Sequence, residues 1–411
     1  GTPDDAKNII TVGSTYAVAP NGDPDDRINR LSENTAHGPA LDGRVIPHLV
    51  APGCSVDSTA PGETEGEAVH GTQCGTSMAA PQVAGAAALF IEHYRGLPEF
   101  EADPSPALVK AALLPVAHDL DGNPDADGGT MGHRPDAKQG WGRLNLSAVI
   151  DPPAGSVLYF DQPTVLDFTG QEWMRVITAA DPGQPVRIML AWTDAPGHGL
   201  GGATPAWNND LDLTVDAGGQ TYLGNVFGAD GFSTTGGTAD GMNNAEGVFL
   251  ETVTGDVTVR VTAADVNSNG VPYVGDDTDQ DFAVVCYNCA LVPDFALSAG
   301  SATVGLCAPE NGPVVVEVEQ LAGFGDPVTL SVTGVPAGAS AGFSPNPVTP
   351  GSSSVLTIDP GTAVDGDYML DVQGDSTTLS RSVDVELKLR TGTPVPAVLT
   401  LPLDAAVDVH P

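Results

Sequence analysis

The residues Gly75-Thr76-Ser77-Met78-Ala79-Ala80-Pro81 open the segment that decides the fold of this chain. An apolar, alanine-rich stretch continues to Tyr94, which is too long for a strand and predicts a tightly packed helix. Pro81 lies near the helix start, where a missing N–H is tolerated. Ser77 then lies in the first turn, where the positive end of the helix dipole faces a charge that develops on a substrate. Because a serine is a weak nucleophile until a base takes its proton, Ser77 is a candidate nucleophile that needs a partner.

Further stretches accompany the Ser77 segment along the chain. They are residues 9–13, 37–44, 49–53, 105–110 and 140–145. In this order they resemble the motifs of the subtilase family of serine proteases, whose signature Gly-Thr-Ser-Met-Ala-x-Pro is present around Ser77. The resemblance implies that residues 1–150 are the C-terminal part of an α/β subtilisin-like catalytic domain, and that the backbone N–H of Ser77 contributes to the oxyanion hole. An α/β-hydrolase elbow is disfavoured, because Ala79 stands where that motif needs its second glycine.

The other catalytic groups of the family are missing from the sequence. The resemblance places the aspartate, the histidine and the oxyanion asparagine before the serine motif, and none of the eight histidines has the family's His-Gly-Thr-x-Val-Ala-Gly context. His70 starts a His-Gly-Thr run that leads straight into the serine motif, so we interpret it as part of a substrate-side loop. The chain departs from many relatives at His48, where they have Asp, and at Cys74, where they have a small polar residue. We expect both ends of the chain to be cuts and the fragment alone to have negligible proteolytic activity.

After residue 150 the pattern changes to strands separated by loops rich in Asp, Asn and Gly. Residues 156–290 predict an all-β sandwich, and the runs at 190–196, 208–213 and 243–246 resemble the jelly-roll domain of large secreted subtilases. Residues 293–390 predict a second all-β sandwich that resembles bacterial immunoglobulin-like repeats. Residues 391–411 are interpreted as a linker and the start of a further module. The sequence therefore predicts a multidomain chain, in which an α/β subtilisin-like fragment is followed by two all-β sandwich domains.

The resemblance to the jelly-roll domain implies a calcium site, and one loop offers suitable ligands. Asp265, Asn267 and Asn269 precede the turn residue Gly270, as in a D-x-N-x-N-G calcium loop, and Asp276 falls at the twelfth position. The alternative is a polar surface loop with turn residues. A weaker calcium candidate spans residues 121–128, because its twelfth position carries no carboxylate.

Charge and cysteine content restrict the partners and the compartment. The chain has 53 acidic and 15 basic residues, a formal net charge of −38, which disfavours nucleic acids and anionic membrane surfaces. No apolar run approaches the roughly 20 residues of a membrane span. Five cysteines cannot all pair within the chain. Cys286 and Cys289 suggest either a zinc or redox site or, as we prefer, a structural disulfide, and Cys54 with Cys74 offers a second disulfide beside Ser77.

These observations favour a secreted serine endopeptidase whose parent hydrolyses peptide bonds through an acyl-enzyme on Ser77. We expect calcium as a structural cofactor, protein or peptide substrates, and a monomer. The alternative is an extracellular adhesion or structural protein that keeps the protease fold as a relic. The complete serine motif favours the peptidase, whereas the β modules fit both hypotheses.

Overall fold

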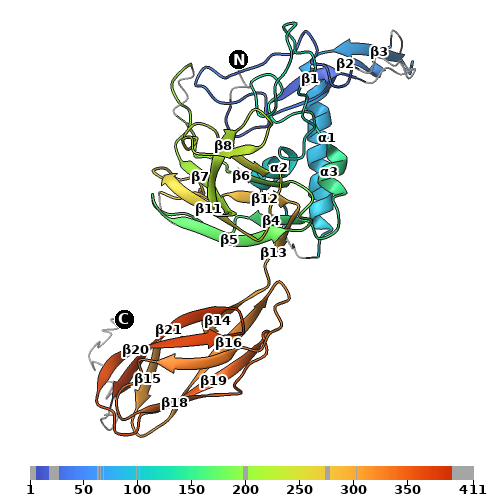
Figure 1. Ribbon diagram of the computed structural model, residues 1–411. Coiled ribbons are helices and arrows are strands. Elements are labelled where there is room, and N and C mark those ends of the chain that lie inside the picture. The colour runs from blue at the N-terminus through green and yellow to red at the C-terminus, as the bar shows by residue number, and fades with distance from the viewer. Residues whose placement is uncertain are drawn as a thin grey trace, which may run out of the picture. The chain divides into compact units, whose positions relative to one another are not determined.

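The computed structural model describes residues 6–17, 27–62, 64, 66–67, 69–98, 100, 102–197, 202–273, 278–301 and 303–390. The chain divides into two compact units, Gly1–Val292 and Pro293–Pro411, whose elements are labelled in Figure 1. The segment 391–411, predicted as a linker and the start of a module, lies outside the described residues. No helix in the described part of the chain is long and apolar enough to cross a membrane.

The first unit begins with a small sheet and three helices. Strand β1 (Val12–Tyr16) pairs in parallel with β2 (Leu49–Ala60), and β2 pairs antiparallel with β3 (Val69–Cys74). The helices are α1 (Thr76–Arg95), α2 (Pro106–Leu113) and α3 (Leu146–Ile150). Buried residues of α1 recur every three or four positions, from Ala79 to Tyr94, so one face of this helix packs into the core. Helix α2 starts as predicted, with the Ser105 side chain accepting the N–H of Leu108 and proline at the next position.

The remainder of the first unit is a sandwich of two sheets, in the strand orders β10-β6-β12-β4 and β13-β5-β11-β7-β8-β9. Its strands are β4 (Val157–Asp161), β5 (Glu172–Ala179), β6 (Val186–Ala191), β7 (Asp210–Ala217), β8 (Gln220–Phe227), β9 (Ser233–Thr235), β10 (Ala245–Leu250), β11 (Asp256–Asp265), β12 (Ala283–Tyr287) and β13 (Cys289–Leu291). Strand β11 alternates strictly, and its valines 257, 259 and 261 enter the core between the sheets.

The helices and the sandwich share one core. Every residue of β10 and of β12 is buried, because each strand is covered on both faces. Val248 and Leu250 belong to the core between the two sheets, whereas Phe249 packs in the same cluster as residues of α1 and α2. Helix α2 contacts β6 and β12 (Figure 1), and the hydroxyl of Tyr287 donates to the carbonyl of Ala112 at 3.0 Å. The segments 1–150 and 156–290, treated separately in the sequence analysis, thus form one compact unit.

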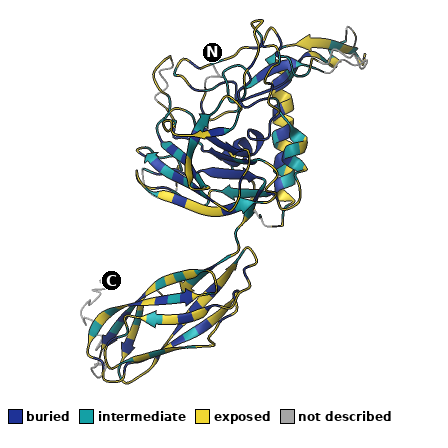
Figure 2. Ribbon diagram, in the orientation of Figure 1, coloured by how far each residue is buried: buried dark blue, intermediate teal, exposed yellow. Residues whose placement is uncertain are grey.

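The second unit contains two four-stranded sheets, in the orders β14-β16-β19-β18 and β15-β21-β20-β17. Its strands are β14 (Asp294–Ala299), β15 (Thr303–Cys307), β16 (Gly312–Leu321), β17 (Thr329–Thr333), β18 (Ser340–Ser344), β19 (Ser352–Asp359), β20 (Gly366–Asp375) and β21 (Ser380–Arg390). Along β16 buried and exposed residues alternate, and along β21 more buried residues alternate with more exposed ones (Figure 2), as expected for strands with one face on a core and the other in water.

Four of the five cysteines form disulfides. Cys54 is bonded to Cys74, and Cys286 is bonded to Cys289, while Cys307 is free and exposed. The preferred interpretation of the Cys286 and Cys289 pair as a disulfide is therefore confirmed, and the zinc alternative for this pair is wrong.

Candidate functional site

Ser77 is the second residue of α1 and its side chain is exposed. The N–H of Gly75, just before the helix, donates to the carbonyl of Gly53 in β2 at 2.7 Å. A Cβ on Gly53 would lie 2.6 Å from the Gly75 carbonyl oxygen and 3.0 Å from the Ala79 Cβ, so only glycine lets β2 approach the helix start this closely. The disulfide between Cys54 and Cys74 joins β2 to β3 immediately before that point. The backbone before Ser77 is thus fixed on two sides.

The electrostatic surroundings of Ser77 suit a developing negative charge. The first turn of α1 carries no acidic residue, so the helix dipole is not opposed there by a carboxylate on the helix itself. Within the described residues, no hydrogen bond holds the Ser77 hydroxyl, which is therefore free to meet a base or a substrate.

None of the described histidines forms a hydrogen bond with Ser77. His48 is buried, its Nδ1 accepts the N–H of Thr11 at 3.0 Å, and burial lowers its pKa well below the ordinary value. His70 lies on the exposed hairpin of β2 and β3, 3.3 Å from Asp57 on the opposite strand. His48 therefore has a structural role in the core, and His70 belongs to the hairpin that precedes the serine motif.

The residues predicted to bind calcium are only partly within the described structure. Asp265 ends β11 opposite Asp210, and Asn267 is exposed, with its Oδ1 accepting the hydroxyl of Ser268 at 2.8 Å. Asn269 forms an isolated bridge with Asp279, and Asp276 lies outside the described residues.

A buried asparagine holds this loop. The side-chain oxygen of Asn209 accepts the N–H groups of Asn267 and Ser268, and its amide donates to the carbonyls of Ser268 and Asp279. Asn209 is fully buried, so these bonds fix the loop against β7.

A second group of acidic residues lies close together that is not predicted from the sequence. Asp210, Asp212 and Glu246 each place a carboxylate oxygen within 4.8 Å of the others. Burial, with the nearby charge of Asp212, raises the pKa of Asp210 to about 7, and burial raises the pKa of Glu246 well above its ordinary value. One sequence signal was present, because Glu246 is the single charged residue of the otherwise apolar strand β10.

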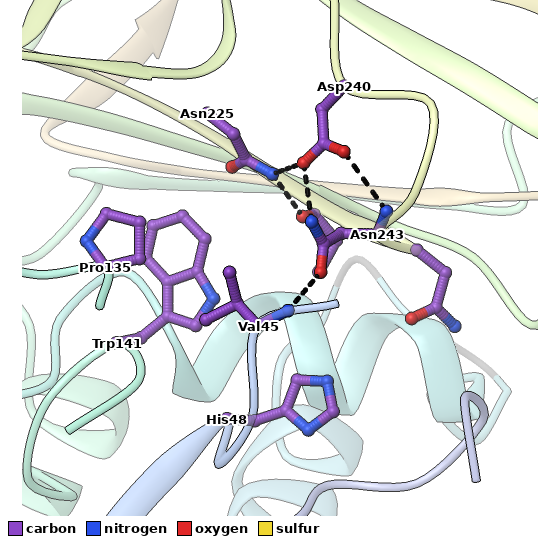
Figure 3. A pocket seen from close by; sticks show the side chains of 9 residues that line it. Val45, His48, Pro135, Trp141, Asn225, Asp240 and Asn243 are labelled. Atoms are coloured by element: carbon purple, nitrogen blue, oxygen red, sulfur yellow. Dashed lines mark hydrogen bonds between the residues drawn. The ribbon is translucent and has the colours of Figure 1, made fainter. Parts of the chain in front are cut away.

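A cavity of about 170 Å³ lies where the N-terminal segment meets the sandwich. His48 and Trp141 line it from one side, and Asn225, Asp240 and Asn243 line it from the other (Figure 3). The side-chain oxygen of Asn243 accepts the N–H of Val45 at 2.8 Å, which ties the two sides together.

Comparison with known proteins gives one family. Residues 1–142 match the subtilase family, Peptidase_S8, and this range contains Ser77 and its motif. The match supports a subtilase-like origin for this part of the chain.

Similar solved structures include parts of the S-layer protein SbsC and of Clostridium thermocellum CbhA. The crystal structure of domains 4 and 5 of the S-layer protein SbsC shares 14% identity at a TM-score of 0.20, covering 43% of this chain and 98% of that chain. The structure of SbsC domains 1–6 shares 15% sequence identity at a TM-score of 0.21, and the match covers 45% of this chain and 28% of that chain. The fibronectin(III)-like modules of Clostridium thermocellum CbhA share 10% sequence identity at a TM-score of 0.17, and the match covers 52% of this chain and 94% of that chain. TM-scores of this size support no conclusion about fold or function.

Proposed function

We propose that this chain is part of a secreted serine endopeptidase of the subtilase type, which hydrolyses peptide bonds of proteins or peptides, and that residues 1–150 are the C-terminal part of its catalytic domain. The observation that carries the proposal is the exposed Ser77 hydroxyl at the start of α1, inside the segment that matches the subtilase family. In this mechanism the Ser77 oxygen attacks the substrate carbonyl and forms an acyl-enzyme. The backbone N–H of Ser77, at the positive end of α1, stabilises the oxyanion.

In this proposal the general base and the second oxyanion donor come from other parts of the parent protein. The described residues supply the rigid part of the site, since the Gly53 contact and the disulfide between Cys54 and Cys74 fix the backbone before Ser77. Two disulfides also favour an oxidising, extracellular compartment.

We expect a fluorophosphonate probe to label the full-length parent at Ser77 and the Ser77→Ala variant not to be labelled. The probe reacts only with a serine whose proton a base removes, so it reports an assembled site. Ser58→Ala is the matched control, because Ser58 is an exposed serine of β2, and its labelling should equal that of the wild type. Equal labelling of wild type and Ser77→Ala would refute the assignment, and a folded parent without any labelling would favour the adhesion hypothesis.

We also propose calcium as a structural ion on the loop of Asp265, Asn267 and Asn269, with Asp276 as the fourth ligand. The hydrogen bonds from Asn209, which hold this loop in one shape, support the proposal.

EDTA is expected to lower the melting temperature of the first unit, and added calcium to restore it. All four tryptophans lie before residue 293, so tryptophan fluorescence follows this unit alone. An identical melting temperature in EDTA and in calcium would contradict the proposal.

A further inference from the structure

Two strands from different sheets bring three carboxylates together. Along β7, Asp210 and Asp212 alternate with the buried Leu211 and Leu213, so the two carboxylates lie on the same face of the strand. Glu246 comes from β10 in the other sheet, and its Oε2 accepts the N–H of Leu213 at 2.7 Å.

Neighbouring backbone makes room for the Glu246 side chain. A Cβ on Gly224 in β8 would lie 2.1 Å from the Glu246 Oε2 and 2.8 Å from its Cβ. Because any larger residue at position 224 would displace the carboxylate, Gly224 allows Glu246 to reach the two aspartates.

The carboxylates retain oxygens without partners. Glu246 is 1% exposed, and its buried Oε1 has no hydrogen-bond partner. The Oδ1 of Asp212 is also buried and unpartnered. An unpaired buried carboxylate oxygen is costly, so this arrangement indicates that a ligand satisfies these atoms.

Two nearby carboxylates, the half-buried Asp240 and the buried Asp194, show how the same unit otherwise satisfies such groups. Asp240 accepts the side-chain amides of Asn225 and Asn243 and the N–H groups of Met242 and Asn243 (Figure 3). Asp194 is paired with Lys7 at 2.6 Å. In contrast, no basic side chain of the described residues forms an ion pair with Asp210, Asp212 or Glu246.

We propose that the carboxylates of Asp210, Asp212 and Glu246 bind one calcium ion, at a site distinct from the loop of Asp265 and independent of the peptidase activity. All three ligands are hard carboxylate oxygens, with neither histidine nor cysteine among them, which suits calcium rather than zinc. Calcium–oxygen distances are about 2.3–2.6 Å, so one ion contacts oxygens that lie within 4.8 Å of one another. The ion joins β7 of one sheet to β10 of the other and neutralises the buried charge between them.

The test compares Glu246→Gln with the wild type in the complete 411-residue chain, using calorimetric titration with calcium chloride and melting followed by tryptophan fluorescence. We expect the variant to bind one calcium ion fewer per chain, or to bind it at least about tenfold more weakly. Glutamine keeps an acceptor for the Leu213 N–H and removes one charge from the cluster. In EDTA the variant should therefore melt at or above the wild-type temperature, whereas in calcium the wild type should melt higher. A merely misfolded variant would melt lower in both.

Two control variants make the result specific. Glu251→Gln makes the same chemical change at an exposed residue and should bind calcium like the wild type. Asn267→Ala alters the predicted loop and should leave the Glu246 ion in place. Unchanged stoichiometry and affinity in Glu246→Gln, or loss of all calcium binding in Asn267→Ala with none lost in Glu246→Gln, would overturn the proposed site.

Discussion

Replacing Asp194 with alanine is expected to lower the free energy of unfolding of the first unit by about 3–5 kcal/mol, because it leaves a buried cation unpaired. The ammonium of Lys7 lies 2.6 Å from Asp194 Oδ2, and the two side chains are 9% and 0% exposed. The same carboxylate accepts the backbone N–H groups of Asn208 and Asn209, both at 2.8 Å. The substitution therefore also leaves two backbone donors without their acceptor. Chemical denaturation followed by tryptophan fluorescence measures the effect on this unit.

Two further variants show whether burial of the pair is the cause. In Lys7→Met combined with Asp194→Ala the loss should be smaller than the sum of the single losses, because the uncompensated charge is gone. Asp103→Ala removes the partner of Arg95 from an exposed, solvent-screened ion pair and should change the free energy of unfolding far less than Asp194→Ala does. If Asp194→Ala lowered the free energy of unfolding as little as Asp103→Ala does, this would contradict the buried environment of the Lys7 and Asp194 pair.

The difference between these two ion pairs shows which parts of the structure can be predicted from the sequence. Local features were predictable: the Ser105 cap and Pro106 define the start of α2, and the alternation along β11 defines its buried face. The ion pair of Lys7 and Asp194 was not predictable, since the two residues are 187 positions apart and no local pattern connects them. The cluster around Glu246 required the same long-range information, because its ligands come from two sheets.

One long-range feature did leave a signal in the sequence. The run 186–191 forms strand β6, whose residues from Ile188 to Ala191 are all buried, as are all six residues of β10. A continuous apolar run is typical of a strand that is covered on both faces, whereas alternation is typical of one with a solvated face. These runs predict that another layer covers the sheet, which is the role of α1 and α2 in the structure.

Trp141→Ala is expected to destabilise the whole first unit by about 3–5 kcal/mol, because it opens a cavity where the two parts of that unit meet. Trp141 is 3% exposed and packs edge-on against Phe227 and Phe249, with ring centroids 5.8 and 5.7 Å away. A Cβ on Gly247 of β10 would lie 2.7 Å from the indole, so the strand is fitted closely to this side chain. Denaturation followed by the fluorescence of the three remaining tryptophans measures the loss.

The shape of the transition matters as much as its midpoint. Because the helices and the sandwich share one core, the wild type should unfold in a single tryptophan-detected transition, and Trp141→Ala should shift that transition without splitting it. Phe168→Ala is the control, since this aromatic side chain is 63% exposed and its removal should change stability by less than about 0.5 kcal/mol. Two separate transitions in the wild type would instead mean that residues 1–150 and 156–290 fold independently. The Trp141 contact would then join two domains rather than complete one core.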